Sequence, residues 1–197
     1  MAPSPTSPER LRKYRSKRNF ARTPEPSGGQ APEAGHRFVV QRHRARALHY
    51  DFRLEAGGVL LSWAVPKGPT LDPNAKRLAV HVEDHPLEYF DFEGVIPGGQ
   101  YGGGDVIVWD WGTWAISDGA DPIAATEKGD LHFDLDGTKL NGHFALVRRG
   151  KRGDKEQWLM LHKKDEYAVE GWDAEDHPES VKTGRTNDEV KAAPAPA

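Results

Sequence analysis

The segment Leu48–Leu54, which reads Leu-His-Tyr-Asp-Phe-Arg-Leu, alternates strictly between apolar and polar side chains. Successive side chains of a β-strand point to opposite faces, so this alternation is typical of a strand with one buried face. The apolar side chains form an ordinary core face. We therefore predict a strand whose opposite face presents His49, Asp51 and Arg53 in one row.

Short apolar runs separated by turns that contain Gly and Pro continue along the chain after residue 37. The expected strands cover residues 38–42, 48–55, 59–65, 77–84, 105–111, 112–116, 131–135, 143–149 and 157–163. Closely spaced short strands with almost no helical pattern predict an all-β fold. We favour a compact closed β-barrel of about eight short strands, because closure leaves no exposed strand edges.

The run 77–84 also alternates, so its odd-numbered and even-numbered residues are expected on opposite faces. The odd-numbered face would carry Arg77, Ala79, His81, Glu83 and His85. Residues 94–104 are rich in Gly and are expected to be irregular. Short helical segments are expected only at 8–18 and 122–127.

Composition divides the chain into three parts. Residues 1–36 are basic and rich in Pro, residues 37–165 hold the expected barrel, and residues 166–197 are acidic and then rich in Ala and Pro. We expect an N-terminal arm that contributes to the active site and an extended C-terminal tail. Arg and Lys predominate in residues 9–22, so the arm can follow a phosphate backbone, although a solvated helix face has the same composition.

Several classes of protein are excluded by composition. The 197 residues include no Cys, which excludes disulfide frameworks and thiolate zinc sites. No apolar run approaches the ~20 residues of a membrane span, and the N-terminus lacks the apolar core of a secretory signal. We therefore expect a cytoplasmic protein without a membrane partner. The net charge of −3 does not by itself indicate nucleic-acid binding.

The polar row can be extended to a metal site by His43, which precedes His49 by six residues across an expected turn. Two imidazoles and one carboxylate with open positions suit Mn²⁺, Fe²⁺ or Zn²⁺. A guanidinium beside such a site, here Arg53, can clamp a phosphate oxygen. The alternative is a solvent-facing strand on which His49 pairs with Asp51 and Arg53 pairs with Glu55.

His85 and Tyr89 follow the strand that carries Glu83. An imidazole and a phenol near a phosphate can bind its oxygens or protonate a leaving group. Lys67 and Arg77 lie near strand ends and can contact phosphates. Taken alone, each of these residues is more often a turn cap, a half-buried phenol or a solvated cation.

Five long motifs resemble the 3′-phosphoesterase domain of bacterial DNA ligase D, and the resemblance extends from about residue 11 to residue 190. The motifs are Phe38–His43, Leu48–Glu55, Leu60–Pro69, Arg77–Tyr89 and Phe92–Gly102. This resemblance implies a compact β-barrel that uses manganese to process DNA 3′ ends in non-homologous end joining. The family removes a terminal ribonucleoside and then hydrolyses the remaining 3′-phosphate to a 3′-hydroxyl.

The resemblance also implies residue roles. The metal ligands would be His43, His49 and Asp51, with Mn²⁺ as the cofactor and Co²⁺ or Zn²⁺ as substitutes. The catalytic residues would be Arg53 and His85, which match phosphate contacts, and Tyr89, which matches a required tyrosine. The supporting residues would be Lys67, Arg77 and Glu83.

The arm carries two further matches, Arg18 and Glu25, at positions that contribute to ribonucleoside removal in the family. Asn19 stands where the family usually has Asp. An amide can hydrogen-bond a ribose hydroxyl but cannot serve as a base, so this departure bears on the first of the two steps.

The sequence therefore predicts a manganese-dependent phosphoesterase that acts as a monomer on DNA primer–template 3′ ends, in the cytoplasm of a bacterium or archaeon near the nucleoid. Residues 178–185 resemble the linker that leads onward in multidomain relatives, but here they are followed by Ala-Pro repeats. We therefore expect a stand-alone protein that acts with a separate ATP-dependent DNA ligase and other end-joining proteins.

Two other functions are compatible with the residues alone. A non-haem Fe²⁺ oxygenase also uses two His and one carboxylate on a β-barrel. A non-catalytic DNA-end-binding module would bind with steep salt dependence but release no phosphate.

Overall fold

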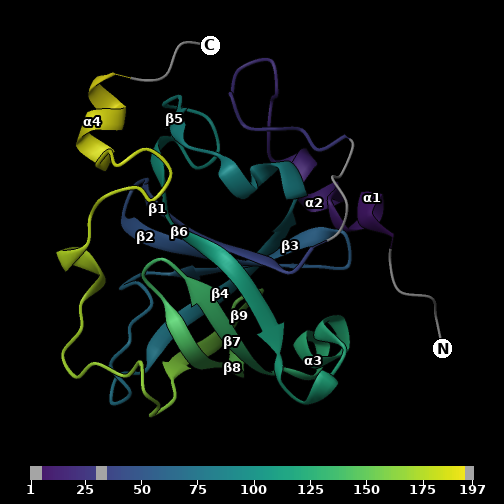
Figure 1. The fold of residues 1–197 in the computed structure, drawn as a ribbon. Helices are drawn as coiled ribbons and strands as arrows, with labels where there is room; N and C mark the ends of the chain where they lie inside the picture. The colour runs from purple at the N-terminus through teal and green to yellow at the C-terminus, as the bar shows by residue number, and fades with distance from the viewer. Residues whose placement is uncertain (1–5, 30–34, 194–197) are drawn as a thin grey trace.

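The computed structural model describes residues 6–29 and 35–193 (Figure 1). Within these residues nine antiparallel strands form one sheet with the order β1-β2-β3-β4-β9-β8-β7-β6-β5. The strands are β1 Arg37–Arg44, β2 Leu48–Ala56, β3 Val59–Val65, β4 Arg77–His85, β5 Gly94–Ile96, β6 Gly104–Ile116, β7 Asp130–Gly137, β8 Asn141–Arg152 and β9 Lys155–His162. Because β1 also pairs with β6, eight strands close into a ring, and β5 adds to β6. The predicted all-β fold is confirmed.

Short helices lie around the ring. They are α1 Ser7–Arg10, α2 Arg12–Ser16, η1 Leu87–Asp91, η2 Ser117–Gly119, α3 Pro122–Lys128, η3 Ala174–Asp176 and α4 Asn187–Ala192. The predicted helical segments at 8–18 and 122–127 correspond to α1 with α2 and to α3. None of the helices in the described part of the chain has the length and apolar composition needed to cross a membrane.

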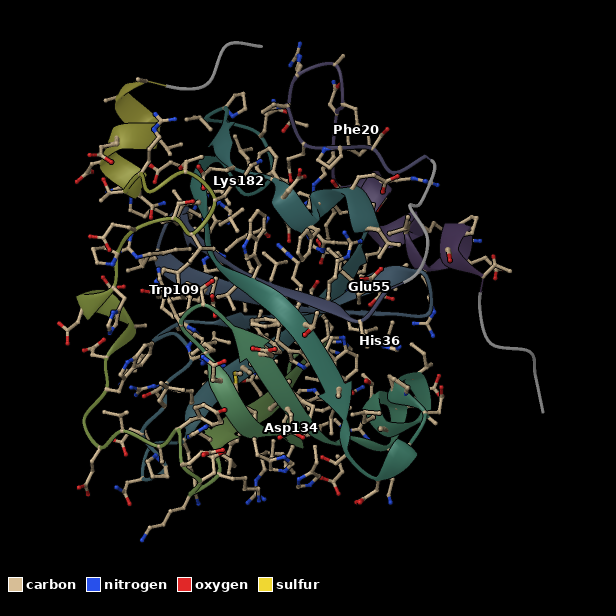
Figure 2. All side chains as sticks on the ribbon, in the orientation of Figure 1. Phe20, His36, Glu55, Trp109, Asp134 and Lys182 are labelled. Carbon is tan, nitrogen blue, oxygen red and sulfur yellow. The ribbon has the colours of Figure 1, made fainter. Side chains whose placement is uncertain are left out.

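The main core fills the inside of the ring (Figure 2). Tyr50, Phe52 and Leu54 of β2 enter it and pack with aromatic side chains such as Trp109 and Phe133. The apolar half of the alternating β2 segment is therefore buried as predicted. The polar half faces the other way, toward the side of the sheet that the arm and the segment after β4 cover.

A second, smaller core lies on that covered side. It joins Tyr14 of the arm to Leu60 of β3 and Leu87, Tyr89 and Phe92 of the segment after β4. The ring of Tyr14 is fully buried and its hydroxyl donates to the carbonyl oxygen of Pro26 at 2.6 Å. This packing anchors the arm on the sheet, which brings the arm's polar residues close to β2 and β4.

The simple alternation predicted for β4 is wrong, because the strand contains a bulge. Ser62 lies opposite Val82, but the next pair joins Leu60 to His85, so β4 carries an extra residue. His81 stacks on the buried ring of Trp63, with the ring centroids 5.1 Å apart. Glu83 and His85 face the covered side, and so does Val82. His81 was expected on the same face as Glu83 and His85, but it does not share their side of the sheet.

The C-terminal segment is docked on the ring and ends in α4, a helix that the sequence analysis did not expect. The amide of Asn187 bonds to the guanidinium of Arg42 at 2.8 Å and to the carboxylate of Asp105 at 2.8 Å. The division of the chain at residues 36 and 165 stays a prediction. The chain has a Pro/Ser-rich start at 1–8, an expected linker at 30–36 and an Ala/Pro-rich end, and of these segments residues 1–5, 30–34 and 194–197 lie outside the described residues.

Replacing Asp110 with Ala is expected to lower the free energy of unfolding by about 3 kcal/mol. This fully buried carboxylate accepts backbone N–H groups from Thr138 at 3.0 Å, Lys139 at 3.0 Å and Leu140 at 2.8 Å. The substitution leaves these donors without their partner. Urea unfolding measures the effect, and Asp134→Ala, at an exposed position on β7, is the control. Equal stability of the two variants would contradict the assigned role.

Candidate metal centre and phosphate pocket

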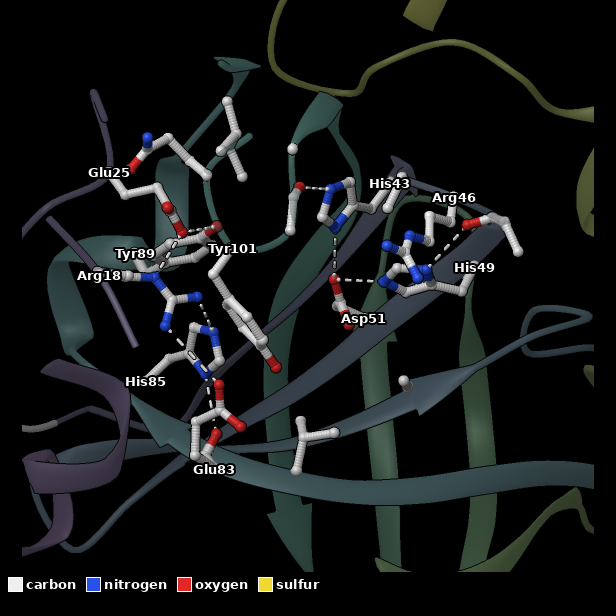
Figure 3. A pocket seen from close by; sticks show the side chains of 18 of the residues that line it. Arg18, Glu25, His43, Arg46, His49, Asp51, Glu83, His85, Tyr89 and Tyr101 are labelled. Carbon is white, nitrogen blue, oxygen red and sulfur yellow. Dashed lines mark hydrogen bonds and ion pairs between the residues drawn. The ribbon is translucent and has the colours of Figure 1, made fainter. Parts of the chain in front are cut away.

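Three side chains from neighbouring strands converge on one point, His43 from β1 and His49 and Asp51 from β2 (Figure 3). His43 and His49 are directly opposite each other in the β1–β2 ladder. Asp51 Oδ2 lies 3.5 Å from His43 Nδ1 and 3.3 Å from His49 Nε2. One ligand atom from each residue lies within 4.8 Å of the others. The structure therefore brings together the three residues that the sequence analysis selected as metal ligands.

Backbone carbonyl groups orient both imidazoles. His43 Nε2 lies 2.6 Å from the oxygen of Gly102, and His49 Nδ1 lies 3.2 Å from the oxygen of Ala47. A carbonyl oxygen only accepts, so each of these nitrogens carries the ring hydrogen. In the neutral rings, His43 Nδ1 and His49 Nε2 then direct lone pairs toward Asp51. Metal-binding histidines are usually supported in this way, so the donor set fits a divalent transition metal.

The charges around Asp51 favour its ionised form. Burial alone would raise the pKa of Asp51, but the nearby His49 and Arg53 outweigh burial and hold the pKa well below its usual range. Burial would likewise lower the pKa of His49, but the charge of Asp51 prevails and raises it. A proton on His49 would compete with a metal ion. Metal binding should therefore weaken as the pH falls.

Arg53 is held in a fixed orientation beside these ligands. Its Nε donates to Gln41 Oε1 at 2.8 Å and its Nη1 donates to Ser62 Oγ at 2.9 Å. The remaining Nη2 lies 3.5 Å from Asp51 Oδ2, and the guanidinium carbon lies 4.9 Å from the centre of the Tyr89 ring. With its side chain only 3% exposed, the guanidinium is positioned in advance to meet a negatively charged group.

Gln41 and Ser62 are functional candidates that the sequence analysis missed. Gln41 Nε2 donates to the carbonyl oxygens of Tyr89 at 2.9 Å and Phe92 at 3.0 Å, so it connects Arg53 to the segment after β4. A signal for Gln41 was present, because it lies two residues before His43 and therefore on the same face of its strand. Nothing comparable pointed to Ser62.

His85 lies on the other side of the pocket from the three ligands (Figure 3). Its Nδ1 donates to the carbonyl oxygen of Glu83 at 2.9 Å, and its Nε2 lies 3.5 Å from Arg18 Nη2. Burial, followed by the positive charges of Arg53 and Arg18, lowers the pKa of His85 well below its ordinary value. The ring is therefore neutral, with a lone pair on Nε2.

This arrangement predicts that His85 stays neutral at pH 6.5, where an ordinary histidine is about half protonated. Because its pKa is lowered, protonation begins only at more acidic pH. A ¹⁵N NMR titration of the imidazoles should show the form with hydrogen on Nδ1 for His85 throughout the neutral range. A midpoint for His85 at or above the ordinary value of about 6.5 would contradict the assignment.

The arm contributes Arg18 and Glu25 to the same pocket. Glu25 Oε2 accepts from Arg18 Nε at 2.8 Å and from the Tyr89 hydroxyl at 2.9 Å, while Oε1 accepts from Thr23 Oγ1 at 3.0 Å. Arg18 Nη1 also lies 3.7 Å from Glu83 Oε1. The predicted residues Arg18, Glu25, Glu83 and Tyr89 therefore form one connected network with His85.

These groups surround a pocket of ≈ 820 Å³. Tyr101, which the sequence analysis did not select, is 46% exposed and stands between the network of Arg18 and the three ligands (Figure 3). Its hydroxyl accepts from Lys17 Nζ at 3.1 Å. Two further cations line the pocket, Arg46 and Lys155, and both are exposed.

Two predicted site residues are not among those that line the pocket. Lys67 is exposed in the turn after β3, and Arg77 begins β4, ahead of the bulge that turns Glu83 and His85 toward the pocket. Their assignment as phosphate contacts stays a prediction. Asn19 is exposed, and its Oδ1 accepts from the backbone N–H of Ala21 at 3.1 Å, within its own turn.

Comparisons with known proteins all point to DNA ligase D. Residues 41–148 match the family model described as the DNA Ligase D 3′-phosphoesterase domain. The "Multifunctional non-homologous end joining protein LigD" of Pseudomonas aeruginosa is 53% identical over 182 residues, which are 89% of this chain and 21% of that protein. The "Multifunctional non-homologous end joining DNA repair protein LigD" of Mycobacterium tuberculosis is 44% identical over 167 residues, 82% of this chain and 21% of that protein.

The "Multifunctional non-homologous end joining protein LigD" of Mycolicibacterium smegmatis is 42% identical over 165 residues, again 21% of that protein and 80% of this chain. The chain therefore spans about a fifth of the length of the curated relatives that it matches.

Proposed function

Because the chain belongs to the family of DNA ligase D 3′-phosphoesterase domains, we propose that it is a manganese-dependent phosphoesterase that processes DNA 3′ ends in non-homologous end joining. The observation that carries this proposal is the convergence of two imidazoles and one carboxylate beside the fixed guanidinium of Arg53. The names of the relatives, which refer to end joining, support the biological setting.

His43, His49 and Asp51 would hold the metal ion, for which we propose Mn²⁺, with Co²⁺ or Zn²⁺ as substitutes. When bound, such a cation supplies positive charge that polarises a phosphoester and makes a water molecule more acidic. The carbonyl groups that hold the far nitrogens of both imidazoles keep the ligand nitrogens directed at this position.

Hydrolysis of a 3′-phosphate breaks the bond between phosphorus and the 3′ oxygen, and negative charge builds up on the surrounding oxygens. Arg53 faces that charge from the side of β2, and Arg18 faces it from the arm. His85 supports this charge through Arg18, because its Nε2 lone pair lies 3.5 Å from Arg18 Nη2 and helps to orient that guanidinium. Positive groups fixed in advance in a largely buried site stabilise such charge far more than the same groups in water.

We propose that the arm positions the terminal nucleoside for ribonucleoside removal. Both carboxylate oxygens of Glu25 are already occupied by Arg18, Tyr89 and Thr23, which favours a positioning role over that of a base. Asn19 bonds within its own turn, which supports a mechanism that does not use it as a base.

The test uses two labelled primer–templates, one with a 3′-terminal ribonucleotide and one with a 3′-phosphate. After the metal has been stripped with EDTA, the protein should release no product. Added Mn²⁺ should restore phosphate release from the second substrate and ribonucleoside removal from the first. Binding of both ends without product under Mn²⁺, Co²⁺ or Zn²⁺ would instead support the non-catalytic end-binding module. Product formation that requires dioxygen and a 2-oxoacid would support the oxygenase.

Several parts of the sequence-based interpretation stay predictions. They are the monomeric state, the location near the nucleoid, and the separate ATP-dependent ligase that would join the 3′-hydroxyl product.

A further inference from the structure

The hairpin formed by β8 and β9 extends beyond the ring. The last pair between β7 and β8 joins Asp130 to Val147, and the last pair between β4 and β9 joins Val80 to Gln157. Beyond these pairs, residues 149–155 are bonded, within the described part of the chain, only across the hairpin itself. Arg148 at the base still donates its backbone N–H to the carbonyl oxygen of Gly129 at 2.9 Å. The two-stranded ribbon of residues 149–155 therefore extends beyond the closed sheet with two free edges.

The ribbon carries four exposed cations, Arg149, Lys151, Arg152 and Lys155. In the described part of the chain, none of the four lies within ion-pair distance of a carboxylate, whereas Arg148 at the base of the ribbon pairs with Glu156 at 3.1 Å. Arg152 lies directly opposite Lys155 in the ladder. Like charges at directly opposite positions destabilise a strand pair, and a bound polyanion would relieve this repulsion.

The ribbon is continuous with the pocket. Lys155 lines the same pocket as the three metal ligands, on the face of the sheet where Val82 and Glu83 also lie. Arg46, in the turn between β1 and β2, is exposed and lies beside His49 (Figure 3). It too has no carboxylate within ion-pair distance among the described residues. Unpaired positive charge therefore extends from the metal ligands to the end of the ribbon.

We propose that the ribbon binds the phosphate backbone of duplex DNA beside the 3′ end that enters the pocket. A two-stranded β-ribbon fits the grooves of B-DNA, and side chains on its edges can reach the phosphates on either side. This inference rests on the proposed function only in that the bound end is a DNA 3′ end. Residues outside the catalytic network would bind the duplex next to that end.

The experiment measures binding of a fluorescent duplex with a 3′-phosphate by anisotropy, in EDTA and at several KCl concentrations. The variant is Arg149→Gln/Lys151→Gln/Arg152→Gln. The slope of log affinity against log salt concentration should become shallower by about 0.9 for each lost phosphate contact, and affinity at about 0.1 M KCl should fall by about tenfold or more. The variant should bind a single-stranded 3′-phosphate oligonucleotide with a smaller loss than the duplex.

The control is Lys76→Gln/Lys164→Gln/Lys191→Gln, which removes the same charge from exposed positions outside the ribbon. A ribbon variant with the wild-type salt slope would overturn the inference. An equal loss in the control, or an equal loss on the single strand, would overturn it as well. Phosphate release by the wild-type protein with Mn²⁺ is measured separately, so failure of the proposed function is distinguished from failure of the ribbon to bind duplex DNA.

Discussion

Replacing Asp51 with Asn is expected to lower the rate of phosphate release from a 3′-phosphate DNA end by at least about a hundredfold. Asn preserves the shape of the side chain but removes the negative charge that lies 3.3 Å from His49 Nε2 and 3.5 Å from His43 Nδ1. Without that charge the two imidazoles hold a divalent cation more weakly. The rate is measured at saturating substrate over a range of Mn²⁺ concentrations, and Mn²⁺ binding is measured separately by electron paramagnetic resonance.

The matched control for this substitution is Asp134→Asn. Asp134 lies 3.2 Å from His143 on the neighbouring strand, so it also forms a His–Asp pair, but the pair is on an exposed surface outside the pocket. This control should retain the rate and the Mn²⁺ affinity of the wild-type protein. Normal activity of Asp51→Asn, in a protein whose melting temperature is unchanged, would contradict the assignment of Asp51 as a metal ligand.

Replacing Arg53 with Lys is the second substitution with a large expected effect, a fall of about a hundredfold in kcat. A single ammonium group cannot bond Gln41 and Ser62 and also face the pocket, which the planar guanidinium does with separate nitrogens. Mn²⁺ affinity should change little, because all three ligands remain. The effect on kcat without an effect on metal binding distinguishes Arg53 from Asp51.

Two further variants serve as controls for Arg53→Lys. Arg37→Lys changes an arginine that pairs with Glu55 at 2.8 Å outside the pocket, and it should leave kcat unchanged. Ser62→Ala removes the bond to Nη1 and the bond that Ser62 Oγ donates to the carbonyl oxygen of Leu60 at 3.0 Å, but it keeps the guanidinium, so it should reduce kcat by less than Arg53→Lys. Wild-type kcat in Arg53→Lys would show that this guanidinium does not stabilise charge in the reaction.

Strand positions were predictable because they depend on local alternation. Strands were expected at 48–55 and 59–65, and the structure has strands at Leu48–Ala56 and Val59–Val65. β5 was missed because its three residues form a strand only by pairing with β6, within a segment rich in Gly. The bulge in β4 was missed for a related reason. The bulge is fixed by the register between β3 and β4, and the alternation of residues within β4 alone cannot predict that register.

The central residues of the site were predictable because they share one strand face, while their surroundings depend on distant parts of the chain. Gln41 is a candidate because of its contacts with Tyr89 and Phe92, and Tyr101 because of its contact with Lys17. The docked C-terminal segment likewise depends on Arg42 and Glu175, which lie far apart in sequence and 2.7 Å apart in space. No local pattern encodes such pairs.

The most direct test of the account compares the wild-type protein with His49→Ala in a single assay. Both proteins are stripped with EDTA, supplied with Mn²⁺ and given a duplex with a 3′-phosphate, and the released phosphate is measured. His143→Ala, which alters a half-buried histidine that pairs with Asp134 outside the pocket, is the control. We expect rapid release by the wild type and the control and almost none by His49→Ala. Equal release by all three proteins would contradict the proposal that His43, His49 and Asp51 form the metal centre of a phosphoesterase.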